Sequence, residues 1–188
     1  MQDEINIPSE GTDAVAGDEA AQMWAFSLEW WRSGRVEEIC LGWQNRFACD
    51  VSFLLWTAWA SGIRQCSLGS NDIKDALEYI AEWRGTIIDP ARAARKGLRT
   101  TDPDLVGMHA REIYSGFRAV ELKGEMREQS MLLDWLDGRG AADNMESSIH
   151  SNMRHYIELL SDDLSAKDYE NLEHIAETAS AILRRIQA

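Results

Sequence analysis

Tryptophan is concentrated in the first third of the chain, and this bias constrains the fold more than any other feature. Trp24, Leu28 and Trp31 follow the i, i+4, i+7 spacing that places side chains on one face of a helix. Bulky aromatic side chains at helical spacing are typical of core packing. We therefore predict that helices of this region build the core. Six of the eight tryptophans lie here: Trp24, Trp30, Trp31, Trp43, Trp56 and Trp59.

Two of these tryptophans are adjacent and cannot both lie at the centre of one helix face. Successive residues of an α-helix point about 100° apart, so Trp30 and Trp31 project in different directions. Trp31 continues the apolar spacing of Trp24 and Leu28, and we expect it to face the core. Trp30 is then expected to be partly exposed.

The most apolar segment of the chain, residues 51–61, predicts the central helix of the fold. Ser52 and Thr57 are its main polar interruptions. A helix that is apolar on all sides is a buried helix. Asp50 comes directly before it, and an aspartate at this position can accept a hydrogen bond from a free amide of the first turn. We therefore predict Asp50 to be a structural N-cap.

Helical periodicity continues through the rest of the chain. Thr86–Ile88 is the only strand-like piece, and Pro90 limits it. Pro90 and Pro103 each follow an aspartate, which is typical of a helix start. Gly116 and Gly124 are positions at which the second of these helices could bend. The helices are expected over residues 18–33, 35–47, 51–61, 72–84, 90–99, 103–136, 143–160 and 165–186.

These patterns predict an all-α fold, an irregular bundle of about seven helices around a central apolar helix. Residues 1–17 hold several carboxylates and no basic residue, so we expect a disordered acidic tail there. Residues 18–188 are expected to form a single helical domain. Within it we distinguish a core at 18–136 and a C-terminal helical pair at 143–187.

The overall charge excludes some classes of function. The net charge of −13 and the pI near 4.7 oppose general binding to nucleic acids or to anionic membranes. The longest apolar run, residues 51–60, is about half of what a membrane span requires. Three cysteines at no metal-like spacing, and no leader pattern at the start, favour reduced thiols and a cytoplasmic location.

Several segments together resemble a known family. They are the run Cys49–Trp56, the pair Trp83-Arg84 leading into Pro90–Lys96, and Ala119–Leu122 with two glutamates and a glutamine behind it. In this order they are similar to a mainly proteobacterial family of uncharacterised small helical proteins, domain of unknown function 2390. The family pattern has an asparagine where this chain has Ser52. The resemblance implies an all-α fold and transfers no catalytic residue.

Positive charge is concentrated in one short segment of this acidic protein. Arg92, Arg95, Lys96 and Arg99 lie at i, i+3, i+4 and i+7, so all four project from one helix face. Arg84 precedes them. Like charges at this spacing repel one another, which predicts compensation from inside the chain or from a partner. The internal candidates are the acidic tail and the carboxylates of the preceding helix, Asp75, Glu78 and Glu82.

The leading hypothesis is therefore a non-enzymatic cytoplasmic interaction protein that binds a protein or another acidic ligand through this basic face. The absence of a helix-turn-helix pattern argues against specific nucleic-acid binding. The apolar stripe of Ile113, Phe117 and Val120 is compatible with homo-oligomerisation. The residues predicted to bind a partner are Arg84, Arg92, Arg95, Lys96 and Arg99.

Two other functions stay open. A small-molecule binder would use a tryptophan-lined pocket between the first and third helices. An enzyme would use buried carboxylates, with Asp50 at its centre, whereas the stripe of Glu121, Glu125 and Glu128 is interpreted as a solvated face. No metal-ligand spacing, phosphate loop or nucleophile motif is present, so we expect neither a metal nor a cofactor. The predicted pocket residues are Trp24, Trp31, Trp56 and Trp59.

Overall fold

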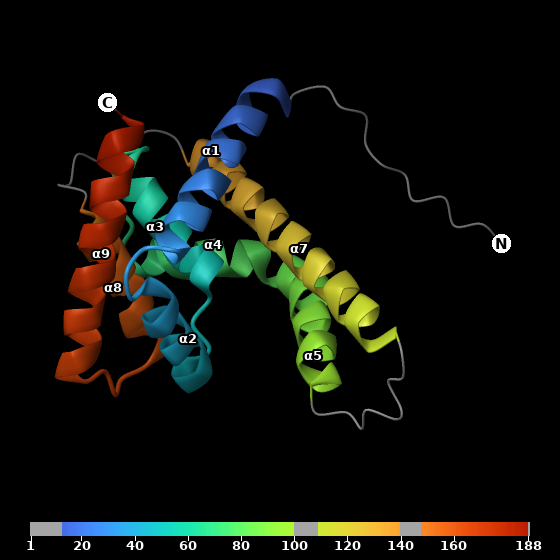
Figure 1. Ribbon diagram of the computed structural model, residues 1–188. Coiled ribbons are helices and arrows are strands. Elements are labelled where there is room, and N and C mark those ends of the chain that lie inside the picture. Colours follow the sequence, from blue (N-terminus) through green and yellow to red (C-terminus); the bar gives the residue numbers. More distant parts are fainter. Residues whose placement is uncertain (1–12, 100–108, 140–147, 188) are drawn as a thin grey trace.

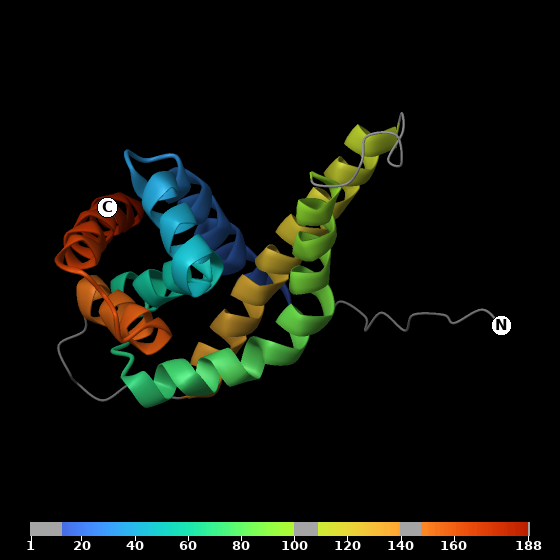
Figure 2. The same ribbon diagram turned by 90° about the horizontal axis from the view of Figure 1, so that it is seen from below.

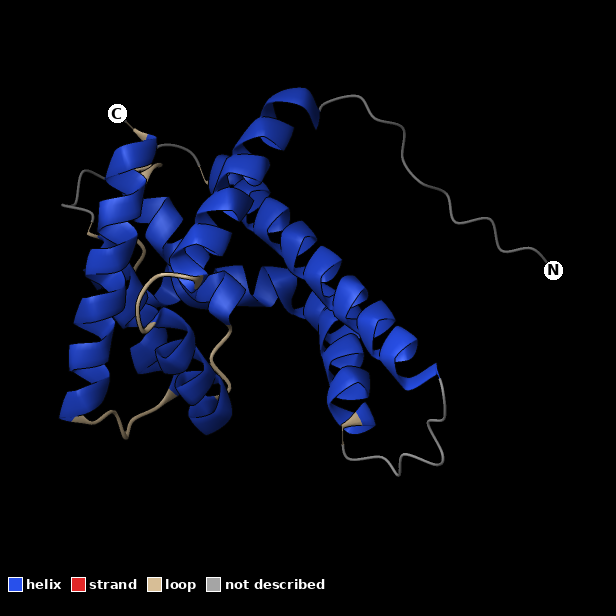
Figure 3. Ribbon diagram, in the orientation of Figure 1, coloured by secondary structure: helices blue, strands red, loops and turns tan. Residues whose placement is uncertain are grey.

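The computed structural model describes residues 13–99, 109–139 and 148–187, with side chains from residue 19 onward. All regular structure in these ranges is helical, which confirms the predicted all-α fold (Figures 1 and 3). The helices are α1 (Asp13–Trp31), α2 (Val36–Phe47), α3 (Val51–Gly62), α4 (Ser70–Trp83), the π-helix η1 (Arg84–Ile88), α5 (Asp89–Leu98), α7 (Ala110–Gly138), α8 (Ile149–Leu160) and α9 (Ala166–Ile186).

The first helix begins earlier than its sequence pattern predicts. We expected a start near residue 18, whereas α1 begins at Asp13. The rest of the predicted acidic tail, residues 1–12, lies outside the described residues, as does the helix start expected at Pro103. Among the described helices, none combines the length and the apolar character needed to cross a membrane.

Helix α3 lies at the centre of the molecule. It packs against α1, α7, α8 and α9, and every residue from Ser52 to Ser61 is buried. Asp50 caps it as predicted, because its Oδ1 accepts hydrogen bonds from the amides of Ser52 and Phe53 at 2.9 and 3.3 Å. A helix that is apolar on all sides is stable only where other helices cover every side, which is the case in this central position.

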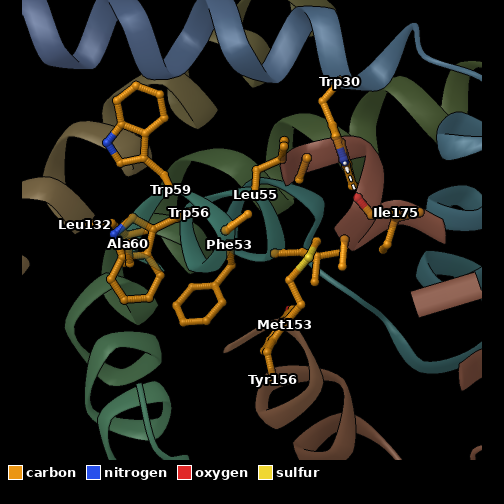
Figure 4. Packing of buried hydrophobic residues seen from close by; sticks show 14 of the residues in the cluster. Trp30, Phe53, Leu55, Trp56, Trp59, Ala60, Leu132, Met153, Tyr156 and Ile175 are labelled. Carbon is orange, nitrogen blue, oxygen red and sulfur yellow. Dashed lines mark hydrogen bonds between the residues drawn. The ribbon is translucent and has the colours of Figure 1, made fainter. Parts of the chain in front are cut away.

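The tryptophan-rich region forms the core around α3. The side chains of Trp30, Trp43, Trp56 and Trp59 are at most 1% exposed. Figure 4 shows Trp56 and Trp59 on α3, with Phe53 beside Tyr156 of α8; the Phe53 and Tyr156 ring centroids are 4.7 Å apart. Tryptophan therefore joins helices to one another in this fold.

The prediction that Trp30 is partly exposed is wrong. Trp30 is fully buried, and its indole Nε1 donates a 3.0 Å hydrogen bond to the carbonyl oxygen of Ile175 in α9 (Figure 4). Trp31 is the half-buried member of the pair. The two side chains do point in different directions, but the face of α1 that holds Trp30 is covered by α9, which is far away in the sequence.

Helices α4, η1 and α5 form one continuous bent helix from Ser70 to Leu98. The strand-like run Thr86–Ile88 lies inside η1 and is helical, in keeping with the predicted all-α fold. The amide of Asp89 donates to the carbonyl of Arg84, five residues back, which is the hydrogen-bond pattern of a π-helix. Figure 2 shows the bend, after which α5 runs beside α7 as an arm that leaves the body of the protein.

Gly124 allows the bent helix to approach α7 closely. The helix α7 runs from Ala110 to Gly138 without a break at Gly116 or Gly124. A Cβ added at Gly124 would lie 2.9 Å from Cγ1 of Ile88. Its carbonyl also accepts a 3.0 Å hydrogen bond from the indole Nε1 of Trp83. The glycine therefore serves contact between helices rather than flexibility.

Asp168 joins the C-terminal helical pair to α2. It forms a capping box with Ser165 at the start of α9, from a serine and an acidic residue three positions apart in the sequence. Its carboxylate is 2% exposed and accepts hydrogen bonds from Trp43 Nε1 at 2.9 Å and from Arg46 Nη1 at 2.7 Å. Burial opposes ionisation of Asp168, but the hydrogen bonds from Arg46, Ser165 and Trp43 outweigh it and hold its pKa below the ordinary value.

We expect Asp168→Asn to lower the free energy of unfolding by about 2 kcal/mol at pH 7, because a buried charged acceptor is lost. A carboxyl whose pKa is lowered by folding stabilises the fold above its unfolded pKa of about 3.9, and this contribution disappears as the pH falls through the folded pKa. Denaturant unfolding of both chains at several pH values should therefore give a stability difference that begins to shrink below about pH 4 and continues to shrink as the pH falls further. A constant difference down to the most acidic conditions would contradict this account.

Candidate functional site

A buried network of ion pairs begins where η1 meets α7. Arg84 of η1 contacts the Asp50 carboxylate and lies 3.5 Å from the Glu128 carboxylate, measured from Nη1 to Oε2. The Glu128 side chain is 0% exposed and that of Arg84 is 18% exposed. Oδ1 of Asp50 thus caps α3 and Oδ2 contacts Arg84, so the role of Asp50 extends beyond the predicted cap.

The network continues along α5. Arg92 donates from Nε to Glu121 and from Nη2 to Glu125, both at 2.8 Å. Arg95 donates to both oxygens of Glu121, which therefore accepts from two guanidinium groups. Such charge-assisted, forked hydrogen bonds are among the strongest in proteins. They fix the face of α5 that carries these arginines against α7.

The carboxyl groups of this network differ in their tendency to ionise. Burial raises the pKa of Glu128 to about 7, against the opposing effect of Arg84. Burial also raises the pKa of Glu125, which receives a hydrogen bond from Arg92. Glu121 is likewise partly desolvated, but its hydrogen bonds from Arg95 and Arg92 prevail and lower its pKa. Glu121 is thus ionised at neutral pH, whereas Glu128 is close to its midpoint.

These contacts correct two expectations about the basic segment. Arg84, Arg92 and Arg95 are mostly buried in internal ion pairs and do not form an open face. The compensating carboxylates come from α7, so the interpretation of Glu121, Glu125 and Glu128 as a solvated stripe is wrong. Asp75, Glu78 and Glu82, the carboxylates expected to compensate, are exposed on α4. Of the five predicted residues, Lys96 and Arg99 stay exposed.

A cleft of about 550 Å³ lies between α1 and α2 on one side and α5 and α7 on the other. One wall carries apolar side chains from α1, α2 and α3, of which all but the buried Leu55 are half-buried or exposed, and the opposite wall carries arginines, glutamates and a tyrosine. Apolar lining comes from Trp24, Leu28, Trp31, Leu41, Val51, Leu55 and Leu122. Charged and polar lining includes Arg92, Arg95, Lys96, Arg99, Tyr114, Arg118, Glu121, Glu125 and Gln129.

Three cations at the outer end of the cleft have no carboxylate partner within the described part of the chain. Lys96, Arg99 and Arg118 are exposed there. Arg99 donates a 2.9 Å hydrogen bond to the phenolic oxygen of Tyr114, which also receives one from Arg95 at 3.4 Å. The hydrogen bonds from Arg95 and Arg99 lower the pKa of Tyr114. This end of the cleft is therefore positive although the protein is strongly acidic.

Residues 22–132, more than half of the chain, match a protein family described as "Protein of unknown function (DUF2390)". The chain belongs to the DUF2390 family. The matched stretch contains every residue that lines the cleft, from Trp24 to Gln129. No curated protein and no solved structure shows significant similarity to this DUF2390 protein.

The structure divides the predicted tryptophan pocket of the DUF2390 protein into two parts. Trp24 and Trp31 line the cleft. Trp56 and Trp59 are fully buried in the core and do not line it, so their assignment to a pocket is wrong. The pocket therefore opens between α1 and the α5–α7 arm rather than between the first and third helices, because the facing sides of α1 and α3 are filled by packing.

Sequence reasoning did not identify the α7 wall of this cleft. Tyr114, Arg118, Glu121, Glu125 and Gln129 are spaced by four, three, four and four residues, the period of one helix face. That regularity was visible, but its polar residues are also typical of a solvated face. Only contact with α5 and α1 distinguishes the two cases.

Proposed function

We propose that this DUF2390 protein binds a small organic anion with an apolar body in the cleft between α1, α2, α5 and α7. One observation carries the proposal: three cations that have no carboxylate partner among the described residues, Lys96, Arg99 and Arg118, share a cleft with the half-buried indoles of Trp24 and Trp31. The cations would bind the charged group, and the indoles would cover the apolar body.

The physical chemistry of the two walls supports such a ligand. A volume of about 550 Å³ is within the range of pockets that bind small molecules. Guanidinium groups bind carboxylate, sulfonate and phosphate groups through directed hydrogen bonds. Half-exposed indoles gain from covering an apolar or aromatic body. A ligand with both features would satisfy both walls.

Two observations favour this function over the alternatives. A protein partner bound by the whole basic segment would have to compete with Glu121, Glu125 and Glu128 for three of the five predicted residues. An enzyme centred on Asp50 would lack a free carboxylate, since that group is 5% exposed and engaged by α3 and Arg84.

The proposal is tested with a pair of fluorescent probes, 1-anilinonaphthalene-8-sulfonate and its uncharged analogue N-phenyl-1-naphthylamine. We expect the anionic dye to bind the native chain. Arg99→Ala/Arg118→Ala should weaken its affinity about tenfold, or ~1.4 kcal/mol. The neutral dye should keep its affinity within about twofold, because it makes no charge contact.

A matched control keeps the change in total charge the same. Lys74→Ala/Arg127→Ala also removes two exposed cations, but both lie outside the cleft. It should leave the affinity for the anionic dye unchanged apart from a small screened effect. Equal weakening by the two double variants, or no binding of the dye to the native chain, would refute the proposed function.

A further inference from the structure

The ion-pair network beside the cleft contains more carboxylates than arginines. Four carboxylates, those of Asp50, Glu121, Glu125 and Glu128, contact three guanidinium groups. Three of these carboxylates are at most 6% exposed, and Glu125 is 21% exposed in its side chain. A fifth carboxylate, Asp89, lies 3.7 Å from Arg84 and from Arg92 but is 54% exposed. An uncompensated buried negative charge is costly, and a proton removes it.

The surplus charge falls on Glu128 and Glu125, one turn apart on α7. Glu128 contacts Arg84 of η1, which also contacts Asp50 at the start of α3. Arg92 of α5 and Tyr156 of α8 are close enough to interact with Glu128 electrostatically. Tyr156 is buried and its raised pKa keeps it neutral. The thiol of Cys49, beside Tyr156 and Arg84, is also kept neutral by burial. Arg84 contacts the buried carboxylates of both Asp50 and Glu128. Arg92 likewise contacts both Glu121 and Glu125.

We propose that the Glu125–Glu128 pair shares one proton that is only partly bound near neutral pH, and that binding of the anion in the cleft increases the uptake of this proton. The inference rests on the proposed function and adds its pH regulation. The pKa of Glu128 near 7 and the raised pKa of Glu125 agree with it. Glu125 and Glu128 lie one helical turn apart and act on each other electrostatically, and interacting carboxyl groups titrate as a pair.

Glu125 connects the pair to the ligand, because it is the member that lines the cleft. An apolar ligand body lying against Glu125 removes water from its carboxyl, and removal of water favours the neutral form. The negative charge of the bound anion also favours the neutral form of Glu125, because like charges repel. Ligand and proton therefore bind together, and by linkage the affinity for the anion rises as the pH falls.

The experiment measures the affinity of 1-anilinonaphthalene-8-sulfonate between pH 6 and pH 8, a range in which its sulfonate does not titrate. No histidine lines the cleft among the described residues. We expect the native chain to bind the dye about fivefold more tightly at pH 6 than at pH 8, within the tenfold per pH unit that one proton allows. Glu128→Gln balances the charge of the network, so its affinity should be independent of pH. Glu78→Gln, an exposed carboxylate on α4, is the matched control and should keep the native pH dependence.

A second measurement tests the proton without the dye. An acidic group whose pKa is raised by folding makes the native state less stable as the pH rises from its unfolded pKa of about 4.3 through its folded value. Unfolding of the native chain should therefore become easier between pH 5 and pH 8, and Glu128→Gln should lose much of this trend. Equal trends in both chains would overturn the shared proton. A dye affinity independent of pH in the native chain would overturn the coupling alone, whereas failure of the dye to bind would overturn the proposed function and the coupling with it.

Discussion

Arg84→Met is expected to lower the free energy of unfolding by about 3 to 5 kcal/mol at pH 8. Arg84 is the cation that contacts both Asp50 and Glu128, and each of these carboxylates is at most 5% exposed. Removal of one partner from a buried ion pair leaves the other charge without compensation, which is far more costly than the pair is stabilising. Methionine keeps most of the side-chain volume, so the loss is mainly electrostatic. Chemical denaturation of native and variant chains measures it.

Two companion variants separate this effect from a general loss of positive charge. Lys96→Met removes an exposed cation of the same segment that has no carboxylate partner among the described residues, and it should change stability by less than about 0.5 kcal/mol. Arg84→Met leaves the carboxylates of Asp50 and Glu128 without a cation. The double variant Arg84→Met/Glu128→Gln also removes one of these two charges, so it should recover part of the lost free energy of unfolding. If Arg84→Met and Lys96→Met are equally mild, Arg84 is not the centre of a buried network.

Trp30→Ala is expected to cost about 3 to 5 kcal/mol, as for other large aromatic side chains removed from a core. The indole is fully buried between α1 and α9 and donates a hydrogen bond to Ile175. The variant therefore creates a cavity and leaves a carbonyl oxygen without its donor. Thermal and chemical unfolding should both show the loss.

Trp24→Ala is the matched comparison for this prediction. It removes the same side chain from the same helix, but Trp24 is half-buried at the cleft. We expect it to cost less than about 1 kcal/mol in stability while weakening binding of either naphthalene dye. Equal stability losses at the two positions would contradict the assignment of Trp30 to the core and of Trp24 to the cleft.

Local signals in the sequence predicted the parts of the fold that depend on neighbouring residues. The carboxylate of Asp50 caps α3 because its partners are two and three residues away, and the Ser165–Asp168 capping box has the same short range. The central place of α3 follows from its composition, because a helix without a polar face has no other stable position. Such features can be read without knowing the tertiary structure.

The candidate site depends on partners distant in the sequence, and the same reasoning failed there. Arg92 and Glu121 are separated by 29 residues, and Arg84 and Glu128 by 44. A basic face and an acidic face each resemble a solvated surface when considered alone, since both are polar at helical spacing. The choice between Trp30 and Trp31 failed for the same reason, because α9 covers one side of α1. Periodicity identifies faces but does not state which faces meet.

The wide turn at η1 also sets the direction in which the arginines of α5 point. In an α-helix each residue advances the side chains by about 100° around the axis. Shortening η1 by one residue would restore ordinary helical winding and rotate everything after it by roughly that angle. Arg92 and Arg95 would then be turned away from Glu121, and the basic wall of the cleft would face another side of the molecule. The one additional residue in this turn thus sets the rotation of α5 about its axis, and this rotation determines which side of the molecule carries the positive charge.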